Sequence, residues 1–288
     1  MEIIFVCTGN TCRSPLAEGL MKKLLTDRGI ESIEVSSAGL AAFPGDGVSE
    51  KSVRAAENYG IDISSHRSRR IDSYMLENAV FVCMTASHAQ ALLPYVDKSR
   101  LFIIGEGIPD PYGGTQEEYD SCAEKISSAL PAVLSEIIST NAEIVPMAEN
   151  HIKEIAEIES LCFSQPWSEK SLKDELTNEN AHFLAAVFEN KVIGYIGIIE
   201  ICGEADITNV AVSPAYRRCR IGEKLLSFAE EGAKQRGCDS ITLEVRVSNE
   251  AAISLYSKNG YKNTGIRKGF YDRPKEDALL MTKIFDEE

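Results

Sequence analysis

The chain lacks the features of a metalloprotein, a membrane protein or a nucleic-acid-binding protein. Its eight cysteines form no Cys-x-x-Cys pair and its four histidines are scattered singly, so zinc-ligand spacing is absent. The longest uncharged apolar run, residues 192–199, is far shorter than the ~18 residues of a membrane span. With 30 Lys and Arg against 44 Asp and Glu, the net charge of −14 argues against binding to nucleic-acid phosphates. We therefore expect a cytoplasmic protein without a metal, a membrane contact or a direct nucleic-acid partner.

The length and the hydrophobic pattern predict two folded domains. At about 150 residues per domain, 288 residues favour two units that each bury a core. Four apolar runs typical of buried parallel strands occur at residues 2–7, 33–37, 79–84 and 101–104. Helical patterns separate these runs, which predicts a three-layer α/β domain with a parallel four-stranded sheet.

The pattern changes after residue 140. Three strand-like segments follow one another without intervening helices, at residues 182–188, 191–200 and 203–212. Helical and strand-like stretches then alternate to the end of the chain. This order favours an α+β domain with a mixed sheet, and we expect the two domains to occupy residues 1–140 and 143–288.

A loop suited to phosphate chemistry follows the first strand. It reads Cys7-Thr8-Gly9-Asn10-Thr11-Cys12-Arg13-Ser14-Pro15 and leads into a helix. Backbone N–H groups in such a loop, together with the helix N-terminus, bind phosphate dianions and favour a thiolate. Arg13 could hold two phosphate oxygens and place the phosphorus in line with the Cys7 sulfur. The pattern therefore predicts phosphoryl transfer to Cys7.

With its buried strand, loop glycine, Ser14 and Pro15, this segment resembles the low-molecular-weight protein phosphatases over residues 1–140. The run Ile108-Pro109-Asp110-Pro111-Tyr112-Gly113-Gly114 is similar to the family's general-acid loop. The resemblance implies that Asp110 protonates the leaving group and then activates water against a cysteinyl-phosphate. It also implies that Ser14 stabilises the Cys7 thiolate. Further expected contributors are the phosphate-binding residues Thr8, Gly9, Asn10, Thr11 and Cys12 and the loop supports Ser37 and His66.

The residue at position 11 bears on the substrate. Members that act on phosphotyrosine usually carry a bulky aliphatic residue there, whereas Thr11 makes the loop resemble the protein arginine phosphatases. A hydroxyl can hydrogen-bond a planar guanidinium, while a branched aliphatic side chain packs better on a phenol ring. We expect arginine-phosphorylated proteins as substrates, with phosphotyrosine as the alternative. Arsenate reductases share this loop but need two further cysteines for a disulfide relay, and Cys83 has no near neighbour.

A basic loop in the second half is suited to a pyrophosphate. Residues 209–226 show a strand, a proline turn, a loop with Arg217, Arg218 and Arg220, and an amphipathic helix. The stretch 143–285 resembles the GNAT acetyltransferases, and among them those that acetylate the N-terminal alanine of ribosomal protein S18. Supporting segments are Gln165-Pro166-Trp167-Ser168-Glu169, Leu243-Glu244-Val245-Arg246-Val247-Ser248-Asn249 and Leu255-Tyr256.

This resemblance implies acetyl-CoA as co-substrate and a protein N-terminus, that of S18, as acceptor. Glu244 would be the general base for the α-ammonium group and Tyr256 the general acid for the departing thiolate. Val210 and Val212 would pair with the pantetheine arm. The expected cofactor-binding residues are Val210, Ala211, Val212, Arg217, Arg218, Cys219, Arg220, Ile221, Gly222, Glu223 and Asn249.

The chain departs from the family at Arg220, which stands where the Arg-x-x-Gly-x-Gly loop has its first glycine. A glycine there relieves steric and φ constraints, so we expect Arg220 to point outward if the loop is to hold a cofactor. The leading hypothesis is a bifunctional enzyme, an arginine-phosphate phosphatase fused to an Nα-acetyltransferase. An acetyltransferase for another amine, or one half kept as a non-catalytic tether, are the alternatives.

Overall fold

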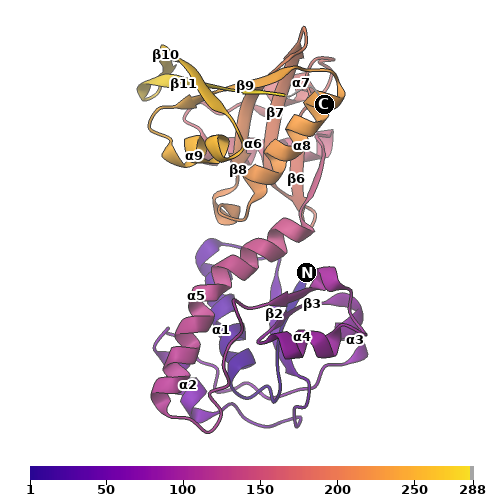
Figure 1. Cartoon of the computed structure of the whole chain (residues 1–288), viewed down its shortest axis with the longest axis vertical. Helices are drawn as coiled ribbons and strands as arrows, with labels where there is room; N and C mark the ends of the chain where they lie inside the picture. Colours follow the sequence, from indigo (N-terminus) through magenta and orange to yellow (C-terminus); the bar gives the residue numbers. More distant parts are fainter. Residues whose placement is uncertain (286–288) are drawn as a thin grey trace. The chain divides into compact units, whose positions relative to one another are not determined.

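The computed structural model describes residues 1–285 and separates two compact units, Met1–Thr140 and Asn141–Glu288 (Figure 1). Among the described residues, no helix is long and apolar enough to cross a membrane. Each unit has its own sheet, and each is described by itself below.

The first unit is built on a parallel sheet. Its elements in chain order are β1 (Glu2–Cys7), α1 (Arg13–Arg28), β2 (Glu34–Gly39), α2 (Glu50–Glu57), α3 (Ser73–Asn78), β3 (Val80–Cys83), α4 (Ala86–Leu92), β4 (Leu101–Ile103) and α5 (Gln116–Asn141). The strand order is β2-β1-β3-β4 and every pairing is parallel. The predicted parallel four-stranded sheet is therefore confirmed.

The central strand β1 explains how the first unit presents its loop. Its residues Ile3 to Val6 are wholly buried because helices cover both faces of the sheet. On one face Ile4 and Val6 pack with Met75 of α3 and Leu92 of α4. Helix α1 packs against β1 and β2 and ends at Gly29, whose φ of +71° closes the helix. The carboxyl end of β1 and the N-terminus of α1 therefore meet at residues 7–13.

The second unit has a larger sheet. Its elements are β5 (Glu143–Pro146), α6 (Ile152–Cys162), α7 (Glu169–Glu175), β6 (Leu184–Phe188), β7 (Lys191–Ile201), β8 (Glu204–Val212), α8 (Ile221–Gln235), β9 (Ser240–Arg246), α9 (Glu250–Lys258), β10 (Lys262–Asp272) and β11 (Lys275–Ile284). The order is β10-β11-β9-β8-β7-β6-β5. Strands β8 and β9 run parallel and the other neighbours antiparallel, which confirms the predicted mixed sheet.

Strands β8 and β9 pair with each other over only about half of their length. They pair only over residues 204–207 and 240–243. Beyond that point β8 continues to pair with β7 through Val212, after a register shift at Gly197/Ile198 that leaves Thr208 as the extra residue. The edge of residues 208–212 that faces away from β7 has no strand partner in the described structure. An extended ligand can bind such an edge by main-chain hydrogen bonds.

Candidate active sites

The Cys7 sulfur in the first unit lies at the end of β1, with only 3% of the residue exposed. The backbone N–H of Asn10 donates to Sγ at 3.2 Å, and Ser14 Oγ lies 3.0 Å from it. Asn10 Nδ2 also donates to Ser14 Oγ at 2.9 Å, so the serine proton is free for the sulfur. Two donors thus converge on Cys7, an arrangement that stabilises a thiolate.

The loop is held in an uncommon conformation by the Asn10 side chain. Asn10 has φ +56°, and Nδ2 donates to Ser37 Oγ at 2.9 Å. Its Oδ1 accepts from the backbone N–H of Arg69 at 2.9 Å and lies 3.2 Å from His66 Nε2. The structure thus brings Asn10, Ser37 and His66 together around the loop.

The end of β2 also shapes the loop. Gly39 pairs with Cys7, and a Cβ on Gly39 would lie 2.7 Å from the Thr8 carbonyl oxygen. Only glycine therefore fits at this contact between the strand and the loop. No sequence pattern indicated this role of Gly39.

Arg13 and Asp110 meet across the cleft beside the loop. Arg13 Nη2 donates to Asp110 Oδ2 at 2.6 Å and Nη1 donates to the Ile108 carbonyl at 3.1 Å. Arg13 is 5% exposed, whereas half of the Asp110 side chain is exposed. Arg13 Nε is buried and has no hydrogen-bond partner within residues 1–285. The guanidinium therefore retains a donor for an anionic ligand.

In the second unit the basic loop precedes α8. Arg217, Arg218 and Arg220 are exposed, whereas Cys219 and Ile221 are buried. Arg220 has φ +57° and is the residue before the helix, so its left-handed backbone and exposed side chain agree with the outward arrangement. The Arg220 side chain does not cap α8, and the first N–H groups of a helix, here including those of Gly222 and Glu223, have no partner within the helix and can bind a ligand.

The base candidate Glu244 lies on β9 directly after the last residue that pairs with β8, and the acid candidate Tyr256 lies on α9. The Glu244 carboxylate on β9 forms an ion pair with Arg267, with 3.0 Å between Oε1 and Nη1. Tyr271 Oη donates to the backbone carbonyl oxygen of Glu244 at 3.2 Å. Burial raises the pKa of Tyr256, and nearby Tyr271 adds to that shift. Asn249 Oδ1 accepts from the Ala252 N–H at 3.2 Å and so caps α9.

Comparison with known families identifies both units. Residues 2–145 match the family described as low molecular weight phosphotyrosine protein phosphatase, and residues 152–261 match the acetyltransferase (GNAT) family. A Bacillus subtilis (strain 168) protein named "Putative ribosomal protein bS18-alanine N-acetyltransferase" is 38% identical over 151 residues, which is 52% of this chain and all of that protein. The chain belongs to both families.

Two further similarities concern the phosphatase unit. Arsenate reductase 2 of Staphylococcus haemolyticus (strain JCSC1435) is 36% identical over 131 residues, 44% of this chain and 92% of that protein. The solved structure of the YwlE arginine phosphatase from Geobacillus stearothermophilus is 28% identical, covers 47% of this chain and 92% of its own, and has a TM-score of 0.42.

The cysteines of the phosphatase unit do not suit a disulfide relay. Cys83 is wholly buried, and burial raises the pKa of its thiol to about 12. The next cysteine along the chain, Cys122, is also buried, with its pKa raised to about 12 for the same reason. Relay thiols need thiolate character and access to solvent, so the arsenate reductase likeness does not extend to that chemistry here.

Two residues of the phosphatase unit were missed by the sequence analysis. Glu18 on α1 accepts from Ser37 Oγ at 2.7 Å and lies 3.6 Å from His66 Nδ1, so it holds two of the loop supports. Glu18 follows Ser14 by one helical turn on α1, and this spacing could have indicated that it faces the loop. On α4, His88 Nε2 lies 3.0 Å from Thr8 Oγ1. No sequence pattern indicated this contact.

His88 belongs to the cleft of the phosphatase unit. Its Nδ1 lies 2.7 Å from Thr85 Oγ1, and burial lowers its pKa, with the Arg13 charge acting in the same direction. The cleft has a volume of about 470 Å³ and is lined by Thr8, Arg13, His88 and Asp110 among others. Of the predicted site residues, Thr8, Arg13 and Asp110 therefore line one cleft.

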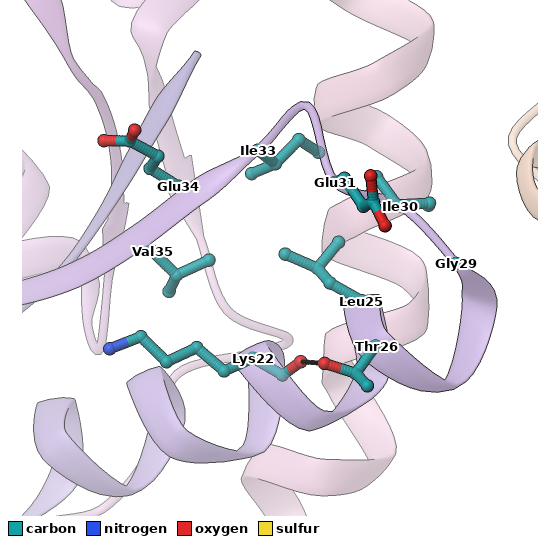
Figure 2. Close-up of a pocket in the computed structure, with 9 residues that line it drawn as sticks. All are labelled: Lys22, Leu25, Thr26, Gly29, Ile30, Glu31, Ile33, Glu34 and Val35. Atoms are coloured by element: carbon teal, nitrogen blue, oxygen red, sulfur yellow. Dashed lines mark hydrogen bonds between the residues drawn. The ribbon is translucent and has the colours of Figure 1, made fainter.

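A second pocket of the phosphatase unit carries none of this chemistry. It has a volume of about 680 Å³ and lies between the end of α1 and the start of β2, where the side chains of Lys22, Leu25 and Val35 border it (Figure 2). It contains no predicted site residue. Its apolar walls, including Leu25 and Val35, are almost completely buried.

Proposed function

We propose that the chain is a bifunctional protein-modifying enzyme, with a protein arginine phosphatase in residues 1–140 and a protein Nα-acetyltransferase in residues 143–288. The observation that carries the first half is the convergence of two hydrogen-bond donors on the Cys7 sulfur, beside Arg13 with its unpaired buried Nε. Family membership of both units supports the two classes of activity.

In the phosphatase reaction, the Cys7 thiolate attacks phosphorus and the bond from phosphorus to the leaving nitrogen breaks. Arg13 and the backbone N–H groups of residues 8–14 hold the equatorial oxygens, and Asp110 gives its proton to the leaving nitrogen. Asp110 then takes a proton from water as the water oxygen attacks the cysteinyl-phosphate. The sulfur–phosphorus bond breaks and inorganic phosphate leaves.

Phosphoarginine is favoured over phosphotyrosine by the residues at positions 11 and 112. Thr11 offers a hydroxyl to the guanidinium nitrogens, and its methyl group is too small to support a phenol ring. Tyr112 is 81% exposed, so its ring is not packed into a wall that could grip a substrate tyrosine. The YwlE structure is named as an arginine phosphatase, which agrees with this choice.

The acetyltransferase unit fits acetyl-CoA. The free edge of residues 208–212 can pair with the pantetheine amides through Val210 and Val212. The uncapped start of α8 and the exposed Arg217 and Arg220 can bind the pyrophosphate, in a chain that is otherwise acidic. Bound acetyl-CoA supplies an acetyl thioester that is reactive toward a neutral amine.

Two side chains of this unit carry out the proton transfers of the acetylation reaction. Glu244 accepts a proton from the substrate α-ammonium, directly or through water, so that the amine can attack. Arg267 Nη1 lies 3.0 Å from the Glu244 carboxylate and so helps to hold that side chain in place for this role. Tyr256 stays protonated because burial raises its pKa, and it provides a proton for the departing thiolate.

The acceptor that we propose is the N-terminal alanine of ribosomal protein S18, on the basis of the named Bacillus subtilis relative. The test incubates the full chain with phosphoarginine and phosphotyrosine peptides, and separately with acetyl-CoA and a peptide that begins with the S18 N-terminus. Release of phosphate mainly from phosphoarginine, and acetylation of the terminal alanine, are expected. Absence of either activity from the folded chain would leave the corresponding unit as a binding module.

A further inference from the structure

The second unit buries one carboxylate that the proposed reaction does not use. Glu159 lies in the last turns of α6 and is 0% exposed. A buried carboxylate is strongly destabilising unless donors surround it. Its surroundings therefore indicate why the chain keeps it.

Three donors from three different elements converge on Glu159. Its Oε2 accepts from the Trp167 backbone N–H at 2.7 Å, and its Oε1 accepts from Asn209 Nδ2 at 3.2 Å and from Tyr195 Oη. Burial, together with the Glu159 charge, raises the pKa of Tyr195, so the phenol remains a donor. No Lys or Arg side chain is paired with Glu159 within residues 1–285. The carboxylate is thus held by hydrogen bonds alone.

Two of the three donors, Trp167 and Asn209, belong to segments that carry the resemblance to the acetyltransferases. Trp167 lies in the segment between α6 and α7 that contains Gln165 to Glu169. Asn209 lies on β8 within the part that has left β9, and its neighbour Val210 is the expected partner of pantetheine. Tyr195 of β7 stands beside that part of β8, because it pairs with Ala211. One side chain therefore links the 163–168 segment to the part of β8 that is expected to hold the cofactor.

We propose that Glu159 is a positioning residue for acetyl transfer, which fixes the 163–168 segment and the free part of β8 in one arrangement. The inference rests on the proposed acetyltransferase function of this unit. The reason for a carboxylate is geometric, because both of its oxygens accept. A glutamine has one accepting oxygen, and its NH2 group would face either the Trp167 N–H or the donors from Tyr195 and Asn209.

The chain offers a direct probe and a matched control. Trp167 is its only tryptophan, so tryptophan fluorescence reports on the 163–168 segment alone. Glu154 lies on the same helix and also accepts a backbone N–H, from Val192 at 2.9 Å at the start of β7, instead of from the 163–168 segment or β8. Glu154→Gln therefore makes the same chemical change without removing a link between these two segments.

The experiment compares Glu159→Gln and Glu154→Gln in the full chain by acrylamide quenching of Trp167 and by calorimetric titration with acetyl-CoA. For Glu159→Gln we expect quenching to rise about twofold or more and the acetyl-CoA Kd to rise about tenfold. Glu154→Gln should change neither. A folded Glu159→Gln protein with unchanged quenching and unchanged Kd would overturn the proposal.

A second variant covers the case in which Glu159→Gln does not fold. Asn209→Ala removes only the link to β8, so it should weaken acetyl-CoA binding about fivefold or more while Trp167 quenching stays unchanged. An unchanged Kd for this variant would refute the role of Glu159 in placing β8. If the unaltered chain neither binds acetyl-CoA nor acetylates a peptide, the proposed function fails instead, and the Trp167 measurement still tests the contact with the segment.

Discussion

Replacement of Ser14 by alanine should remove one of the two hydrogen bonds that favour the Cys7 thiolate. Ser14 is wholly buried, its Oγ lies 3.0 Å from the sulfur, and its proton is directed there because Asn10 already donates to the oxygen. A hydrogen bond to a charged group contributes about 1.5–3 kcal/mol. If this is lost from the attacking thiolate, kcat/KM should fall about tenfold to 150-fold.

The assay measures kcat/KM for a phosphoarginine peptide and the rate at which iodoacetamide alkylates Cys7, located by peptide mapping. Both should fall in Ser14→Ala. The matched control is Ser52→Ala, because Ser52 is equally buried in the same unit but its Oγ has no hydrogen-bond partner within residues 1–285. If Ser14→Ala stays within about twofold of the unaltered chain, as Ser52→Ala should, the assignment of Ser14 to the thiolate is wrong.

Three further outcomes are expected. Thr11→Ile should exchange phosphoarginine activity for phosphotyrosine activity, and an unaltered chain that already prefers phosphotyrosine peptides would reject the assigned substrate. Arg220→Gly should bind acetyl-CoA no more than about tenfold more tightly by calorimetry, since Arg220 faces solvent; undetectable binding before the substitution and ready binding after it would contradict this. Burial lowers the pKa of His66 and His88, so below about pH 6.5 the unfolded chain binds more protons than the folded chain. The free energy of unfolding should therefore decline as pH falls through that region. A thermal unfolding temperature that is constant from about pH 7.5 to 5 would disprove this.

The sequence was informative where a local pattern determines the structure. The apolar run of β1 followed by Cys7, Arg13 and Pro15 predicts a strand, a loop and a helix, because each residue acts on its chain neighbours. Helix α3 was not predicted, since it has only six residues and its main signal is the Asp72 side chain that caps it.

The contacts that cross the fold could not be predicted in this way. His88 reaches Thr8 from α4, eighty positions away, and the periodicity of neither segment contains that contact. The point at which β8 leaves β9 is equally hidden, because the pairing ends while both strands continue. Glu159 lies on the helix stripe of Ile152 and Ile155, where a sequence rule expects an apolar residue or an exposed charge.

The central claim is that one chain carries two chemically separate active sites. The most direct measurement assays phosphoarginine hydrolysis and alanine N-acetylation on the full-length variants Cys7→Ser and Glu244→Gln. Cys7→Ser should abolish phosphatase turnover and leave acetylation at the level of the unaltered chain, and Glu244→Gln should do the reverse. Loss of both activities in either folded variant would contradict the account.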